Sequence, residues 1–359
     1  MSKLLEKYLS VVKEILPQKT HMSSVGIDLG AYSFKAVELN QKGDTVEIAN
    51  WLIEDIGPAG MGEALKKIIE KLKLDNKGIN IAIAGQGTLI RHIDMPQMSL
   101  TDLKKSFEIE ADKYFPFSND QIFTDCFILS PKGKENMMSV LVAAAKKEII
   151  NHRLSLFSSV GLQPQLISMN AVALANAFNT FARLDLLKRN IPKDQAPLQA
   201  TAVLDMGESI CTLIILKGDL LWFTRDIFIG GRDLTKRISN TLDIGIPEAE
   251  KIKCQQGEKS SAIASACESI LMNLISEIRL SFDYFVEENN MQISKLYLTG
   301  GSSLFEGVTD FFRKIIDVPV EMWNLTPLVR TPEGISREAA SRNIVKLGVA
   351  LGLALNRYD

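Results

Sequence analysis

The sequence predicts an α/β protein built from two related lobes that face each other across a cleft. Short runs rich in β-branched residues alternate with helical stretches along the chain, which is typical of α/β proteins. Two of these runs match each other, because residues 26–39 align without a gap on residues 203–216 and place Asp28 on Asp205. A chain of 359 residues is long enough for such a duplication, with a core in each copy.

Each copy of the repeat is expected to form a strand, a tight turn and a second strand. The Asp-x-Gly motifs at 28–30 and 205–207 then lie at the tips of two hairpins, where backbone amides point outward. A third signal is the pair Gly300 and Gly301, which follows a predicted strand and lets a flat ligand approach the backbone.

The segment between the two hairpins contains what we interpret as an insertion in the first lobe. Ser99 is expected to cap a helix that ends near Phe115, and two further strands follow. A final helix at 341–355 carries small residues that permit close packing, so we expect it to be buried and to return to the first lobe. The predicted units are an N-terminal tail at 1–22, the first lobe at 23–90 and 140–199, the insertion at 91–139, the second lobe at 200–340, and the C-terminal helix at 341–359.

Composition argues against several classes of partner and site. The 41 lysine and arginine residues are balanced by 43 aspartate and glutamate residues, so no charge excess favours nucleic acid or an anionic membrane. No stretch approaches the roughly 20 apolar residues that a membrane span needs. Residues 1–16 lack a continuous apolar region and a small-residue cleavage site, so we do not expect a secretory signal there. The cysteines lie far apart, which argues against a zinc or disulfide framework and favours the cytoplasm. They are Cys126, Cys211, Cys254 and Cys267.

The residue pattern of the N-terminal tail predicts one amphipathic helix. Apolar residues recur at helical spacing over 4–16, and the helix ends before Pro17. This stripe could pack on its own domain, dock on a partner or touch a membrane surface. Its few basic residues favour a protein partner over lipid.

The three glycine-containing turns together suit a nucleoside triphosphate. Such a ligand needs amides or cations around its phosphates, carboxylates to hold a hydrated magnesium ion, and space beside the adenosine. We expect Asp28 and Asp205 to hold Mg²⁺ mainly through water. The phosphates would lie against the turns at 30–33 and 207–209, with Ser33, Lys35 and Ser209 contributing. Gly300 and Gly301 would lie against the adenosine.

A single Asp-x-Gly motif in a hairpin is most often only a turn. Two motifs in register, followed by a Gly-Gly turn, favour a nucleotide site, and no Walker A sequence competes for that role. The three histidines, His21, His92 and His152, are scattered, so a nucleophilic triad is not indicated.

These motifs resemble the phosphate-binding and adenosine-binding segments of the actin, heat-shock chaperone and sugar-kinase superfamily. Within it the chain is most similar to the PilM family of type IV pilus platform proteins, from residue 24 onward. The segments that carry this resemblance are 25–30 with Ser33, Lys35 and 37–39, then 91–96, Glu110, 114–117, 142–145, 225–231 with Thr235, and 249–253.

The resemblance implies an actin-like, ribonuclease H-like fold with two lobes around a nucleotide cleft and an inserted subdomain placed as in the division protein FtsA. It implies that Gly230, Gly231 and Ser302 also belong to the nucleotide site, and that Glu250 and Lys253 reach the ribose and adenine. An E-x-x-K pair on a helix is otherwise most often a surface salt bridge.

The resemblance also bears on hydrolysis. Members that turn over ATP well carry glutamine or glutamate at the start of the first connecting helix, at 170–179, where it orients the attacking water. Asn170 occupies this position and cannot act as a base. We therefore expect weak ATP hydrolysis or none, and we assign no catalytic residue.

The implied partner is the short cytoplasmic N-terminal tail of the membrane protein PilN, and through it the PilN/PilO platform and the pilus motor ATPases. The tail would lie in a groove between the first lobe and the insertion, in a cytoplasmic protein held at the inner membrane by its partners. Candidate groove residues are aromatic or proline, although they would equally suit the core of the insertion. They are Phe107, Tyr114, Phe115, Pro116 and Phe117.

Two other functions that occur in this superfamily fit the sequence less well. A small-molecule kinase needs a catalytic aspartate and a larger insertion for its substrate. A filament-forming division protein like FtsA is expected to carry its amphipathic helix at the C-terminus, whereas the predicted one here is N-terminal.

Overall fold

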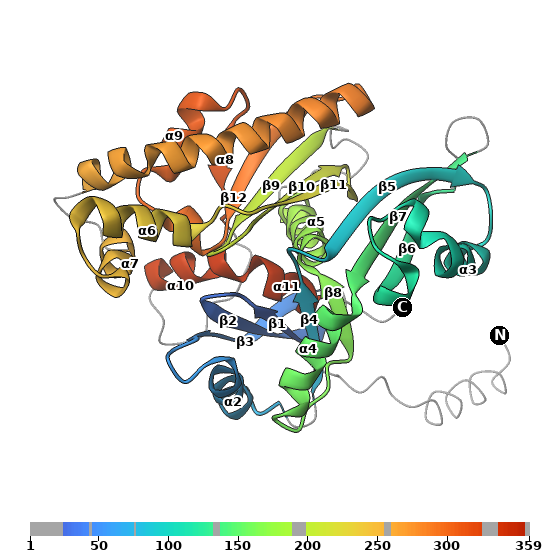
Figure 1. Ribbon diagram of the computed structural model, residues 1–359, viewed down its shortest axis with the longest axis horizontal. Coiled ribbons are helices and arrows are strands. Elements are labelled where there is room, and N and C mark those ends of the chain that lie inside the picture. Colours follow the sequence, from blue (N-terminus) through green and yellow to red (C-terminus); the bar gives the residue numbers. More distant parts are fainter. Residues whose placement is uncertain are drawn as a thin grey trace, which may run out of the picture.

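The computed structural model contains two five-stranded sheets of identical topology and a smaller three-stranded sheet (Figure 1). No described helix combines the length and apolar character that a bilayer crossing requires. The expected N-terminal helix at 4–16 lies outside the described residues. The structure describes residues 24–42, 45–74, 77–131, 137–188, 199–254, 260–324 and 337–355.

Lobe one is built on a sheet with the strand order β3-β2-β1-β4-β8, in which β1, β2 and β3 are antiparallel and β4 and β8 run parallel to β1. Five of the six residues of β1 are buried, because helices cover both faces of the sheet. Its strands are β1 (Ser24–Leu29), β2 (Ser33–Lys42), β3 (Thr45–Asp55), β4 (Gly78–Ile83) and β8 (Leu166–Met169), and its helices are α2 (Met61–Leu72), α4 (Lys147–Ser158) and α5 (Asn170–Lys188).

Lobe two repeats this sheet in the order β11-β10-β9-β12-β13, with the same pattern of parallel and antiparallel pairs. The duplication that the sequence predicts is therefore present in the fold. Its strands are β9 (Ala200–Met206), β10 (Cys211–Lys217), β11 (Leu220–Ile227), β12 (Ile293–Thr299) and β13 (Val320–Met322). Its helices are α6 (Gly231–Leu242), α7 (Ile246–Cys254), α8 (Ser260–Asn289) and α9 (Val308–Ile315), with the 3₁₀ turn η5 (Gly301–Leu304).

The insert is a three-stranded antiparallel sheet with the order β5-β7-β6, packed on one helix. The Ser99 side chain accepts a hydrogen bond from the Asp102 amide at 3.1 Å, which is the helix cap that the sequence predicts. The expected boundaries, 91 and 139, fall inside β5 and β7. The elements are β5 (Thr88–Pro96), α3 (Leu100–Glu110), η1 (Ala111–Lys113), η2 (Asn119–Gln121), β6 (Ile122–Ser130) and β7 (Met137–Lys146).

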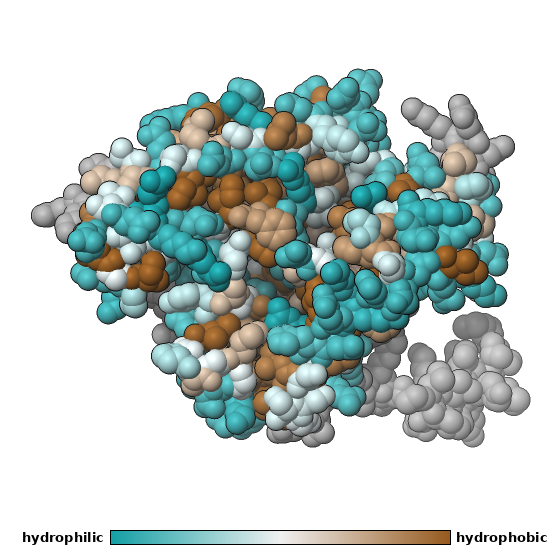
Figure 2. Space-filling model, in the orientation of Figure 1, coloured by the Kyte–Doolittle hydropathy of each residue, from teal (hydrophilic) through white to brown (hydrophobic). Residues whose placement is uncertain are grey.

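Two crossing helices, α5 and α11, join the lobes. The C-terminal segment forms α10 (Arg337–Ile344), η7 (Val345–Leu347) and α11 (Gly348–Ala354), and every residue of α11 is buried. An ideal Cβ at Gly352 would lie 1.6 Å from the Ala173 carbonyl oxygen on α5, and one at Gly26 of β1 would lie 2.1 Å from the Ala350 oxygen. Glycine is therefore needed for α11 to pack between α5 and the sheet of lobe one. In Figure 2 the largest group of hydrophobic residues lies over lobe two, below helix α8, and smaller groups are scattered over the rest of this face.

The insert also contacts lobe two through a pair of rings. His92 of β5 packs against Trp222 of β11 with ring centroids 4.3 Å apart and planes tilted by 32°, and Lys217 lies 4.4 Å from the centre of the Trp222 ring. The buried Nε2 atom of His92 has no hydrogen-bond partner among the described residues. Burial lowers the pKa of His92 and nearby Lys217 lowers it further, while Asp94 opposes both. The folded environment therefore favours the neutral form of His92.

This contact predicts a loss of stability in acid. The folded protein lowers the pKa of His92 below its ordinary value of about 6.5, so the unfolded chain binds a proton at this residue more readily than the folded protein does. The stability that the neutral His92 contributes is therefore present above about pH 6.5 and is lost as the pH falls. Urea unfolding should show that the free energy of unfolding falls more between about pH 7.5 and pH 5.5 for the wild type than for His92→Phe, a variant that keeps a ring on Trp222. An equal difference in both proteins would show that His92 is not responsible.

Candidate nucleotide site

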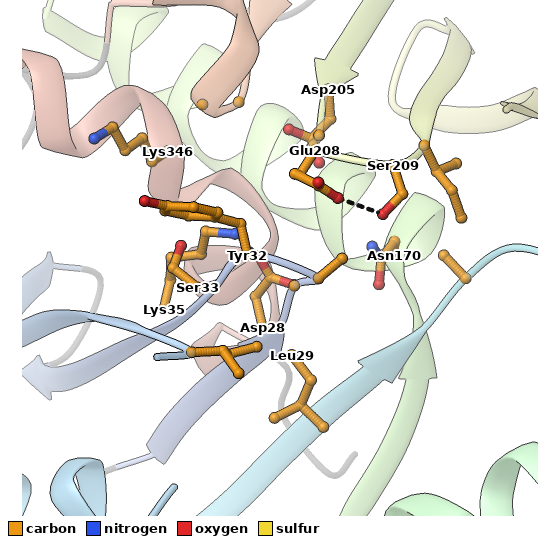
Figure 3. Close-up of a pocket in the computed structure, with 18 of the residues that line it drawn as sticks. Asp28, Leu29, Tyr32, Ser33, Lys35, Asn170, Asp205, Glu208, Ser209 and Lys346 are labelled. Atoms are coloured by element: carbon orange, nitrogen blue, oxygen red, sulfur yellow. Dashed lines mark hydrogen bonds and ion pairs between the residues drawn. The ribbon is translucent and has the colours of Figure 1, made fainter. Parts of the chain in front are cut away.

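A cavity of about 820 Å³ lies between the lobes, and both hairpin turns open into it (Figure 3). This volume falls within the usual range of small-molecule sites. Thirteen of the residues that the sequence predicts for the nucleotide site line this cavity, although they are scattered over most of the chain. These residues are Asp28, Gly30, Ser33, Lys35, Asn170, Asp205, Gly207, Ser209, Glu250, Lys253, Gly300, Gly301 and Ser302.

The wall of lobe one carries an ion pair between neighbouring strands. Asp28 of β1 lies directly opposite Lys35 of β2 in the antiparallel register, and the Lys35 Nζ atom is 3.1 Å from the Asp28 Oδ2 atom. Burial alone would lower the pKa of Lys35, but the Asp28 carboxylate and hydrogen bond raise it overall. Lys35 therefore stays charged in the cavity, where it can attract an anion.

The wall of lobe two presents a second carboxylate. Asp205 of β9 and Asp28 extend into the cavity from opposite sides (Figure 3). Desolvation raises the pKa of Asp205 to about 7, and the negative charge of Asp28 adds to this effect. The two carboxylates thus repel each other, and a bound cation would relieve that repulsion.

Gly300 allows the turn at Gly300 and Gly301 to lie against Asp205. Its φ is +89°, and an ideal Cβ would lie 2.3 Å from the Asp205 Oδ1 atom. Thr299, the preceding residue, pairs with Asp205 in the parallel β9–β12 register. Any other residue at position 300 would both strain the backbone and displace the carboxylate.

The hairpin turn of lobe two, at 207–209, is held by side chains around it. Ser209 donates its hydroxyl hydrogen to the Glu208 carboxylate at 2.8 Å, and Arg232 donates to both Glu208 oxygens at 2.8 Å each. The Gly231 amide at the start of α6 donates to the Gly207 carbonyl at 3.0 Å. Together these bonds fix the turn at 207–209 against helix α6.

Glu250 and Lys253, on one face of α7, contact both each other and α6. The Lys253 Nζ atom lies 2.7 Å from the Glu250 Oε2 atom, and it also donates to the Thr235 hydroxyl at 2.9 Å and the Gly231 carbonyl at 3.2 Å. The pair is therefore a salt bridge that also lines the cavity. Gly230 and Gly231 do not line it, but a Cβ at Gly231 would lie 2.4 Å from the Ser302 hydroxyl oxygen.

Several further polar residues that sequence reasoning missed line the cavity, among them Tyr32, Arg153 and Lys346. Tyr32 lies beside the first motif and Lys346 on η7, and the two appear together on one side of the cavity in Figure 3. Arg153 comes from α4, far from each motif. Tyr32 could have been found from its place in the hairpin turn, whereas no local pattern marks Arg153 or Lys346.

A hydrogen bond joins the lobes beside this cavity. Asp226 of β11 accepts from the Gly85 amide of lobe one at 2.7 Å and from the Thr212 hydroxyl of β10 at 2.7 Å. Gly85 has a φ of +89° and begins the turn that leads from β4 into the insert. Asp226 thus holds lobe one, lobe two and the root of the insert together.

The aromatic residues predicted for a partner groove fall into two groups. Phe107 and Phe115 are buried in the insert's own core, and the Tyr114 ring lies tilted against Phe107 with centroids 5.2 Å apart. Pro116 is exposed. Phe117 lines a second cavity, of about 390 Å³, together with residues of both lobes. Core packing thus accounts for Phe107 and Phe115, whereas Phe117 lines the second cavity.

Two matching lobes around a cavity, each contributing one hairpin turn, define an actin-like fold, and the predicted fold class is confirmed. A chain of the structure described as "PilM-PilN type IV pilus biogenesis complex" superimposes with a TM-score of 0.79 at 23% sequence identity, covering 93% of this chain and 98% of that chain. The ethanolamine utilization protein EutJ from Carboxydothermus hydrogenoformans matches with a TM-score of 0.52 at 16% identity, covering 98% of both chains.

The family follows from the sequence itself. The model of the family "Type IV pilus assembly protein PilM" matches residues 26–358, which is nearly the whole chain. The chain therefore belongs to the PilM family of type IV pilus assembly proteins, as its motifs predict.

Proposed function

We propose that this protein is an ATP-binding scaffold of the type IV pilus assembly machinery, in which the nucleotide holds the two lobes together. The observation that carries this proposal is that Asp28 and Asp205, from equivalent hairpins of the two lobes, line one cavity. A ligand bound between them contacts both lobes at once, so its binding energy favours the closed arrangement.

The residues of the cavity suit Mg²⁺ and ATP. When bound, the magnesium ion and the phosphates of ATP would supply the charges that bridge the lobes. Asp28 and Asp205 would hold the hydrated ion mainly through water, since magnesium keeps much of its hydration shell. Within the described residues, no three acidic, histidine or cysteine side chains gather as a metal site of their own. The hairpin amides and Lys35 would hold the phosphates, and Gly300 leaves space beside the adenosine.

Hydrolysis is expected to be weak or absent. Asn170 lines the cavity at the first position of α5, where an active hydrolase needs a side chain that orients or deprotonates water. The amide of asparagine has no basic atom that can take this proton. Nucleotide then serves to stabilise one arrangement of the lobes, which is the role a scaffold requires.

We further propose that the partner is the short N-terminal tail of PilN, with this protein on the cytoplasmic side of the inner membrane. The similar chain of known structure comes from a PilM-PilN complex, which supports this partner. The 390 Å³ cavity beside the insert is lined by Leu89, Ile90, Phe117 and Phe228, and it offers apolar side chains to a peptide. Through this tail the protein would join the PilN/PilO platform and the pilus motors.

A peptide titration tests the partner site. A fluorescent peptide with the sequence of the PilN tail should bind the wild type, and Phe117→Ala should weaken binding about tenfold or more, because it removes an aromatic wall of the cavity. Phe127→Ala is the matched control, since Phe127 is a 62% exposed phenylalanine of β6 that lines neither cavity. Equal affinity of all three proteins would place the peptide elsewhere.

A further inference from the structure

Arg153 brings a positive charge into the nucleotide cavity from an element that the motifs do not include. Helix α4 turns one face to the cavity, with Glu148, Ile149, His152 and Arg153 along it. Arg153 is partly buried, and it lies near enough to Asp28 for that carboxylate to affect its pKa. The guanidinium therefore sits at the Asp28 end of the cavity.

Within the part of the chain that the structure describes, this arginine has no counterion. Among the described residues, no hydrogen bond or ion pair involves Arg153, and its removal from water lowers its pKa. Two of the three lysines of the cavity differ, because Lys35 pairs with Asp28 at 3.1 Å and Lys253 pairs with Glu250 at 2.7 Å. Lys346, like Arg153, has no hydrogen bond or ion pair among the described residues, but it lies near the α7 end of the cavity. A partly desolvated cation without a partner gains most from an anion that enters the cavity.

The position of α4 indicates which part of a nucleotide would reach Arg153. Helix α7, which carries Glu250 and Lys253, and helix α4 lie on opposite sides of the region between the lobes (Figure 1). Lys346 lies near the α7 end, since its charge affects the pKa of Cys254. If the adenosine lies beside α7 and Gly300, the end of the phosphate chain extends toward α4.

We propose that Arg153 binds the terminal phosphate of a nucleoside triphosphate and lets the protein distinguish triphosphate from diphosphate. This inference rests on the proposed nucleotide function. The planar guanidinium can donate two parallel hydrogen bonds to one phosphate, which gives both charge and geometry. A diphosphate is one phosphate shorter and leaves Arg153 unpaired.

Calorimetric titration with Mg-ATP and with Mg-ADP tests this role. Arg153→Gln should lower the affinity for Mg-ATP about tenfold or more, because it removes a charge-assisted hydrogen bond. Its affinity for Mg-ADP should stay within about twofold of the wild type, which also shows that the variant is folded. Arg153→Lys keeps the positive charge but not the planar group that donates two parallel hydrogen bonds. Its affinity for Mg-ATP should therefore fall between those of the wild type and Arg153→Gln. Arg91→Gln, an exposed arginine of the insert that lines neither cavity, should match the wild type.

The outcomes separate this inference from the nucleotide proposal. If the wild type binds neither nucleotide, both fail. If the wild type binds both nucleotides, and Arg153→Gln weakens the binding of both equally or of neither, the proposed role of Arg153 is overturned while the proposed nucleotide site stands. If Arg153→Gln does not fold, as judged by circular dichroism, Arg153→Lys decides in the same way: a loss confined to Mg-ATP supports the role, and any other result overturns it.

Discussion

Replacing Asp205 with alanine is expected to lower the affinity for Mg-ATP about 100-fold or more, and Asp28→Ala should have a similar effect. Asp205 lies where burial and Asp28 raise its pKa to about 7, so the site holds a carboxylate that gains strongly from a cation. Asp28 holds Lys35 at 3.1 Å, so its loss also frees the lysine. Calorimetric titration with Mg-ATP measures both effects.

The control for these variants is Asp317→Ala. Asp317 is 97% exposed and lies outside the cavity, so its removal should leave Mg-ATP affinity unchanged. Asp205→Asn keeps the shape of the side chain but not its charge, and it should lose affinity like Asp205→Ala. If the asparagine variant bound Mg-ATP as well as the wild type, the carboxylate would not be acting on the metal.

Replacing Gly352 with alanine is expected to destabilise the protein by about 3 kcal/mol or more. The added Cβ would lie 1.6 Å from the Ala173 carbonyl oxygen, so α11 and α5 would have to move apart in the middle of the core that joins the lobes. The effect opposes helix propensity, since alanine is otherwise favoured over glycine within a helix by roughly 1 kcal/mol. Urea unfolding monitored by circular dichroism gives the difference.

Gly62→Ala is the matched control for this prediction. Gly62 also lies in a helix, α2, and an added Cβ there would have no atom within 4 Å. The same substitution should therefore be neutral or slightly stabilising at Gly62 and strongly destabilising at Gly352. Similar unfolding midpoints for the two variants would argue against close packing of α5 and α11.

The residues of the candidate nucleotide site could be predicted to lie together largely because of the duplication. Asp28 and Asp205 recur in matching strand-turn-strand segments, so their register predicts equivalent positions in two sheets, and the structure brings both into one cavity. Gly300 was found for a related reason, because a Gly-Gly turn after a strand marks a close approach of the backbone. These are local patterns with a direct structural meaning.

Residues that depend on tertiary packing could not be found in this way. Arg153 lines the cavity because α4, which follows β7 directly in the chain, packs beside it. No pattern near Arg153 in the sequence marks this position. The hydrogen bond between Asp226 and Gly85 joins segments far apart in the chain, so no spacing rule predicts it. Phe107 and Phe117 are equally aromatic in sequence, but the fold buries the first in a core and places the second against a cavity.

A crystal structure of the protein with Mg²⁺ and a non-hydrolysable ATP analogue tests most directly whether the two lobes hold one nucleotide between them. We expect the phosphates between the turns at 30–33 and 207–209, with the metal near Asp28 and Asp205 and the adenosine against Gly300. Density for the analogue on an outer face, with the cavity between the lobes filled only by water, would contradict this account.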